Sequence, residues 1–360
     1  MDVLDYIFGS LSSGWYSLLD YVSQHTLTCL VPALFIAGAI AVFIKKEAIL
    51  RFFGPDVPKW KSYPVASISG TILAVCSCTI LPLFAGLYKK GSGIGPAIAF
   101  LYSGPAINVL AIVYTAGALG YGIGIARAVA SISISVIIGL IMAAIFRKHD
   151  LELRKSTSVQ PVQSMTEEGR PTPQWATAAL FISLMGILLF GASPLIWLIK
   201  GPIVLVLIAV LILLMMRFFH KDQVRSWWIE TWDLTKKIVP ILIIGAFVVG
   251  IIAYIIPPES FRSFLGNEGI IANLIASIVG ALLYMPTLLE VPIVGTTFGY
   301  SDGLIGSGPA LSLLLAGPAV SLPSMIVLYR IVGARKTITY IALVIFLSAL
   351  MGFIYGNLFA

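Results

Sequence analysis

The chain has 360 residues, of which 59% are hydrophobic and 11% are charged, and its formal net charge is +7. Soluble domains carry about a quarter charged residues, so this composition excludes a water-soluble protein and indicates a polytopic protein whose partner is the lipid bilayer. The basic residues flank apolar runs, where they set topology and meet lipid headgroups. No nucleic-acid-binding motif accompanies them, so we predict no nucleic-acid partner.

Ten apolar runs approach the roughly 20 residues that a helix needs to cross a bilayer. Residues 1–26, before them, mix apolar and polar side chains and predict an interfacial segment. The ten runs lie at 27–44, 64–88, 94–118, 121–146, 174–199, 202–219, 238–256, 270–295, 304–329 and 337–359.

The spacing of these runs predicts an all-α protein with two four-helix repeats and broken helices, flanking two linking transmembrane helices. After the N-terminal segment, the predicted parts are a first repeat (27–146), a polar linker (147–173), the linking helices (174–219), an amphipathic connector (220–237) and a second repeat (238–360). The linker is rich in charged residues, Pro and Ser, and the connector carries three tryptophans.

An internal repeat is visible in matched glycines and prolines. Gly70 and Pro82 match Gly280 and Pro292, and the run Ser-Gly-Pro-Ala at 103–106 matches Ala-Gly-Pro-Ala at 316–319. An even number of predicted spans separates equivalent segments, so the copies share one orientation if every segment crosses the bilayer. A re-entrant loop or an odd crossing between them would make the repeats inverted.

Prolines interrupt equivalent segments of both copies. Pro82 in the first copy, and Pro286 and Pro292 in the second, each remove a backbone donor and free a carbonyl one turn earlier. Freed carbonyls are costly in hydrocarbon, so they must face protein, water or a ligand. A single kinked helix is commonly satisfied by its neighbours, but broken helices in corresponding positions of two halves point to a transport site at the midplane.

Cys76, Ser77 and Cys78 lie in the first broken segment. Residues two apart on a regular helix point about 200° apart, so the thiols can share a ligand only if the backbone is locally unwound. Such a pair would suit a soft, thiophilic centre such as trivalent arsenic. The alternative is that both cysteines are small packing residues. They are weak metal candidates, because no histidine lies near them in sequence, and we predict neither a stable metal site nor a cofactor.

Three further polar residues are candidates for the substrate pathway. Glu290 precedes Pro292 by two residues, and an ionisable group at that depth is costly enough to be a functional candidate and a proton carrier; the alternative is that it snorkels to an interface. Asn108 follows the Gly-Pro pair of the run 103–106, and Ser321 occupies the matching position in the second copy. We expect a pathway role for Asn108 and a structural one for Ser321.

The motif Gly70-Thr-Ile-Leu-Ala-Val-Cys-Ser-Cys-Thr-Ile-Leu-Pro82, followed by Lys89-Lys90 and the run from Gly95 to Asn108, resembles the ArsP/YraQ-type permease family. Residues 280–292 and 316–323 resemble its second half. The resemblance implies a multi-pass permease of the inner membrane, and the best-described members export trivalent organoarsenicals. Many members have no assigned substrate. Thr79 replaces the glycine common after the second cysteine in relatives.

We therefore predict a secondary transporter, not an enzyme, which moves a small thiophilic solute such as a trivalent organoarsenical through the interface of the repeats. The alternative is a passive channel, or an uptake permease for a small sulfur-containing anion or a soft metal species. No histidine lies in a predicted span to activate a serine, which argues against catalysis. The absence of a nucleotide-binding loop means that ATP could drive transport only through a partner. A homo-oligomer is compatible with the sequence.

Overall fold

The computed structural model describes residues 3–20, 30–43, 51–54, 57–73, 77–147, 173–192, 197–255, 262–283, 285 and 289–359. All regular elements in these ranges are helices, which confirms the predicted all-α polytopic fold and agrees with the need of a membrane segment to satisfy its own backbone. They are α1 (Val3–Asp20), α2 (Val31–Phe43), α4 (Lys59–Leu73), α5 (Ser77–Lys89), α6 (Ile94–Ala106), α7 (Val109–Leu119), α8 (Tyr121–Ile145), α10 (Gln174–Ala192), α11 (Trp197–Phe218), α12 (Lys221–Ile255), α13 (Arg262–Leu265), α14 (Ile270–Leu282), α15 (Glu290–Pro292), the π-helix η3 (Ile293–Thr297), α16 (Ser307–Ala316), α17 (Leu322–Val332) and α18 (Ala334–Leu358).

Few of the described helices are both long enough and apolar enough to cross a bilayer unaided. Within the described ranges, α8, α18 and residues 201–218 of α11 meet both requirements, and α6 with α7 forms a fourth candidate span bent by 42°. Five shorter apolar stretches have 10 to 17 residues, fewer than the roughly 20 of a straight crossing. Several of the ten predicted segments are therefore built from shorter helices joined at breaks.

The second of the two segments that were predicted to be broken is interrupted. In the first, 64–88, residues 74–76 between α4 and α5 lie outside the described residues. In the segment 270–295, α14 ends at Leu282 and α15 begins only at Glu290. After Pro292 the chain continues as a π-helix rather than an α-helix, a local widening of the turn that is common at functional sites.

Two consecutive helices in each half have matching lengths. α7 and α17 both have 11 residues, and α8 and α18 both have 25. One glycine joins each pair: Gly120 has φ 112° and Gly333 has φ 85°. Only glycine adopts such backbone angles readily, so the same sharp turn follows α7 and α17.

The long helices α8 and α18 pack against each other and run antiparallel. At one end, the Tyr355 hydroxyl near the end of α18 lies 3.0 Å from where a Cβ on Gly122, at the start of α8, would be. At the other end, Lys336 at the start of α18 donates a 2.8 Å hydrogen bond to Tyr88 near the end of α5. The next helix, α6, begins beside the last part of α8. The shared orientation expected from counting spans does not hold for these two helices.

The core is centred on α6 and α16. Every residue of α6 is buried, and so are residues 308–316 of α16. Each packs closely on its neighbouring long helix through glycines: Gly95 faces Gly139 on α8, and Gly308 faces Gly352 on α18. Small residues let membrane helices approach closely where apolar side chains gain little from leaving lipid.

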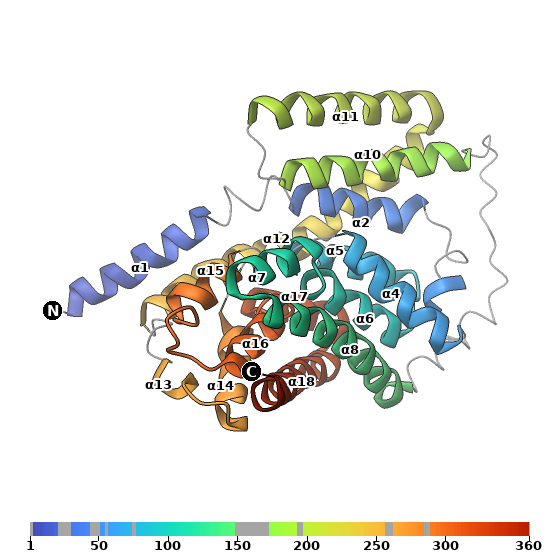
Figure 1. Ribbon diagram of the computed structural model, residues 1–360. Coiled ribbons are helices and arrows are strands. Elements are labelled where there is room, and N and C mark those ends of the chain that lie inside the picture. The colour runs from blue at the N-terminus through green and yellow to red at the C-terminus, as the bar shows by residue number, and fades with distance from the viewer. Residues whose placement is uncertain are drawn as a thin grey trace.

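The helices α1, α2, α10, α11 and α12 pack on one another beside this core. Figure 1 shows α10 and α11 side by side at one edge, where α10 also contacts α2. α1 packs along α12. The predicted connector 220–237 and the predicted span 238–256 are not separate elements, because α12 runs without a break from Lys221 to Ile255. Pro240 lies inside it, so this proline does not end the helix.

Candidate functional site

A buried ion pair joins the two halves of the molecule. The Arg127 guanidinium, from α8, pairs through Nη2 with Oε1 of Glu290, the first residue of α15. The Arg127 side chain is 0% exposed and that of Glu290 is 1% exposed. Glu290 is thus buried in the protein rather than snorkelling to an interface. A charge at this depth is tolerated when an opposite charge keeps the site neutral.

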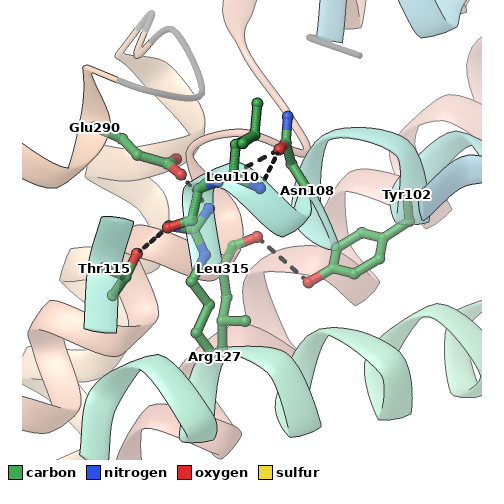
Figure 2. Close-up of polar contacts among 8 residues, drawn as sticks. Tyr102, Asn108, Leu110, Thr115, Arg127, Glu290 and Leu315 are labelled. Carbon is green, nitrogen blue, oxygen red and sulfur yellow. Dashed lines mark hydrogen bonds and ion pairs between the residues drawn. The ribbon is translucent and has the colours of Figure 1, made fainter. Parts of the chain in front are cut away.

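Thr115 on α7 orients the guanidinium. Its Oγ1 accepts a 2.8 Å hydrogen bond from Arg127 Nη1 and donates one of 2.7 Å to the Ala111 carbonyl. The sharp turn at Gly120 folds α8 back against α7, which brings Thr115 and Arg127 together. Figure 2 shows that Arg127 is held between Thr115 on one side and Glu290 on the other.

Part of this polar centre has no partner within the described structure. Arg127 Nε and Glu290 Oε2 are buried and make no hydrogen bond. A guanidinium has five donors and commonly binds a carboxylate through two parallel bonds, but here a single carboxylate oxygen is engaged. The site therefore keeps unused donors and an unused acceptor in its interior.

Buried hydroxyl groups lie next to the ion pair. The Tyr102 hydroxyl donates a 3.4 Å hydrogen bond to the Leu315 carbonyl of α16 and lies within electrostatic range of Arg127 and Glu290. Ser131 on α8 and Ser348 on α18 have buried hydroxyls that make no hydrogen bond in the described structure. The Tyr102 hydroxyl and the ion pair are polar groups inside an apolar core (Figure 2).

Asn108 and Ser321 begin equivalent helices. The Asn108 carbonyl oxygen accepts hydrogen bonds of 3.0 and 3.3 Å from the amides of Leu110 and Ala111, which caps α7. Ser321 caps α17 through a reciprocal arrangement with Ser324. Each position satisfies free amides at a helix start, so both residues have a structural role in this conformation.

The predicted cysteine motif is described only in part. Cys76 and Pro286 lie outside the described residues, and Ser77 and Cys78 are the first two residues of α5. Pro82 is buried within α5, and Pro292 closes α15. Among the described residues, no group of three or more His, Cys, Asp and Glu side chains could hold a metal ion.

Neither Arg127 nor Thr115 was predicted as a site residue. Arg127 could have been identified, because it is the sole charged residue between Tyr121 and Phe146, inside an apolar run of spanning length. Such a residue is as strong a candidate as Glu290 for a functional role. The pairing itself could not be read from the sequence, because 163 residues separate the two partners.

Comparison with known proteins gives a match over nearly the whole chain. A family model described as "Predicted permease" matches residues 12–357. The UPF0718 protein MJ0584 of Methanocaldococcus jannaschii is 39% identical over 99% of this chain and 98% of its own length. The UPF0718 protein YraQ of Escherichia coli is 23% identical over 90% of this chain and 76% of its own. No solved structure matches the chain.

Proposed function

We propose that this chain, which belongs to the predicted permease family matched over residues 12–357, moves a small solute between its two halves, past the Arg127–Glu290 pair. The observation that carries the proposal is that each half supplies one charge to a fully buried pair at their interface. Charges inside a membrane protein mark substrate pathways and proton relays far more often than they stabilise the fold.

The arrangement of the halves supports alternating access. Equivalent helices α8 and α18 are antiparallel and contact each other. Tyr102 and Leu315, which are 213 residues apart and occupy equivalent positions, form a hydrogen bond. Residues that touch their own equivalents lie near a symmetry axis, so we infer inverted repeats related by an axis perpendicular to α8 and α18. Such repeats commonly place broken helices at a midplane site.

For the solute we propose a small thiophilic species such as a trivalent organoarsenical, held at Cys76 and Cys78. The support is the Cys-Ser-Cys motif itself, whose Cys78 is the second residue of α5 and lies four residues before Pro82. The second candidate is a small sulfur-containing anion, taken up or conducted passively. Arg127 favours it, because a guanidinium is the donor that anions bind best.

Flux into proteoliposomes tests the proposal. Uptake of methylarsenite and of thiosulfate is compared, with and without a proton gradient, for the wild type, Glu290→Gln and Cys76→Ser/Cys78→Ser. Glu230→Gln is the matched control, because Glu230 pairs with Lys89 at 2.8 Å on the exposed surface. We expect at least a tenfold loss of flux in Glu290→Gln and none in the control. Equal flux in all variants would remove the buried pair and the cysteines from the mechanism.

A selective effect would identify the solute. Loss of methylarsenite flux in the double cysteine variant, with thiosulfate flux unaffected, supports the thiophilic candidate. The reverse dependence, with thiosulfate flux that ignores the proton gradient and survives Glu290→Gln, supports the passive anion pathway instead.

A further inference from the structure

The buried pair is incompletely bonded, and this is where a ligand could act. Arg127 engages only one oxygen of Glu290, and its Nε and the second Glu290 oxygen are left without partners in the described structure. A carboxylate that serves only as a structural counter-ion gains by taking both sides of the guanidinium fork. The observed contact instead leaves donors of Arg127 unused while the side chain is completely buried.

The groups that face Glu290 are few. Arg127 on α8 contributes the charge, and Tyr102 on α6 contributes a phenol within electrostatic range. Tyr340 on α18 is within electrostatic range of Tyr102, and Thr115 on α7 binds the guanidinium. Phenols are neutral near pH 7. Protonation of Glu290 would therefore leave Arg127 as a buried cation without an anion among the groups named here.

A buried cation without a counter-charge is strongly unfavourable. The charge balance is restored if an external anion replaces the Glu290 carboxylate on Arg127. Before the exchange the site holds Arg⁺ and Glu⁻; afterwards it holds Arg⁺, the anion and neutral Glu290. One proton and one monovalent anion have entered, and the net charge of the site has not changed.

We propose that Arg127 is a binding site for a small monovalent anion carrying a carboxylate or similar oxyanion group, and that the anion binds together with a proton that neutralises Glu290. This inference deepens the proposed function, because it rests on solute access to the interface between the halves. It favours the second solute candidate, an anion, over the thiophilic species and makes the transport of that anion electroneutral. The buried hydroxyls of Ser131, on the same helix as Arg127, and of Ser348 have no hydrogen-bond partner in the described structure.

The second half lacks an equivalent site. At the repeat spacings, Tyr340 takes the position of Arg127 and Ile80 takes that of Glu290. Both side chains are buried, and they line one pocket together with Leu328, the counterpart of Thr115. An uncharged pair cannot hold an anion by charge, so each chain binds one anion and takes up one proton.

Formate and acetate are suitable probes, because they carry the group that Glu290 now presents to Arg127, while gluconate is a bulky control anion. Melting temperatures are measured for the full-length protein in detergent at pH 6 and pH 8. The variants are the wild type, Glu290→Gln, which imitates the protonated acid, and Arg127→Gln/Glu290→Gln, which removes both charges.

Relative to gluconate, we expect formate to raise the melting temperature of Glu290→Gln by about 3 °C or more at both pH values. The wild type should respond at pH 6 more than at pH 8, and the double variant should not respond. A pH-sensitive dye should report uptake of about one proton per anion by the wild type and none by Glu290→Gln.

The proposal is overturned if folded Glu290→Gln melts at the same temperature in formate and gluconate, or if the double variant responds as strongly. If Glu290→Gln folds only in formate, the proposal is supported. If this variant folds in neither salt, the test is proton uptake by the wild type, and a lack of anion-linked proton uptake refutes the proposal.

Failure of the anion-site proposal can be distinguished from failure of the proposed permease function. Formate binding without solute flux refutes the permease function alone, whereas flux without anion-linked proton uptake refutes the anion site alone.

Discussion

The Tyr102 hydroxyl donates a hydrogen bond to the carbonyl oxygen of Leu315, its own counterpart 213 residues later in the chain. A contact between equivalent positions occurs where two related halves meet at their common axis. For the inverted repeats that we propose, the axis would pass between Tyr102, near the end of α6, and Leu315, near the end of α16. Tyr102 lies within electrostatic range of the Arg127–Glu290 pair, so relative movement of the halves would act close to the charged site.

Tyr102→Phe removes this bond but keeps the ring. The 3.4 Å separation is long for a hydrogen bond, so we expect a loss of about 0.5–1.5 kcal/mol in the free energy of unfolding. Chemical denaturation in detergent would measure it. A loss above about 3 kcal/mol would mean that the hydroxyl has partners beyond the Leu315 carbonyl, such as the neighbouring serines.

Crosslinking tests the antiparallel arrangement of α8 and α18. With Cys29, Cys76 and Cys78 replaced by serine, the pair Gly122→Cys/Tyr355→Cys should react with a short bismaleimide, because Tyr355 reaches Gly122. The matched control is Gly122→Cys/Lys336→Cys, since Lys336 lies at the opposite end of α18, beside Tyr88. Efficient crosslinking of the control and not of the first pair would show that the helices are parallel.

The sequence predicted the helical membrane fold and the interruption between α14 and α15, because both depend on local properties: apolar length, proline and glycine. It also identified Glu290, since a carboxylate in an apolar run is conspicuous. Arg127 was equally conspicuous in its run and was overlooked. The cap formed by Asn108 could not be distinguished from a ligand contact, because both uses need the same polar side chain after a Gly-Pro pair.

Orientation of the halves is a property that the sequence could not supply. Counting apolar runs gives the relative orientation of the halves correctly only if every run crosses the bilayer. A broken helix does not have to cross it, so the count alone does not fix the orientation. The antiparallel packing of α8 and α18 depends on contacts between residues more than 200 positions apart, such as Tyr88 with Lys336, at a separation of 248. No local pattern encodes such contacts.

Gly352→Ala tests the close approach of α16 and α18. An added Cβ would lie about 2.5 Å from both the Gly308 carbonyl and the Asn273 side chain, which is far closer than atoms normally approach. We expect a destabilisation of about 1–3 kcal/mol or more, because the packed backbone must shift. Gly117→Ala on α7 is the control, since nothing lies within 4 Å of its added Cβ; this variant should be neutral or slightly stabilising. Equal effects of the two variants on the melting temperature would contradict the packing described here.

A double-mutant cycle measures how much the buried pair depends on both partners. Arg127→Gln or Glu290→Gln alone leaves one uncompensated buried charge, and we expect each to cost about 3–5 kcal/mol in the free energy of unfolding. Removing both charges together should cost much less, because the remaining amides are neutral and can bond to each other. The exposed pair Lys89 and Glu230, with side chains 41% and 37% exposed, serves as the control and should show a coupling below about 1 kcal/mol.

The cycle also separates a structural pair from a functional one. If the double variant is nearly as stable as the wild type but transports nothing, the charges are retained for function at the interface of the halves. If stability and transport are both retained, the pair is dispensable and the pathway must lie elsewhere. Additive single effects would mean that Arg127 and Glu290 do not interact in the folded protein, against the contact seen between them.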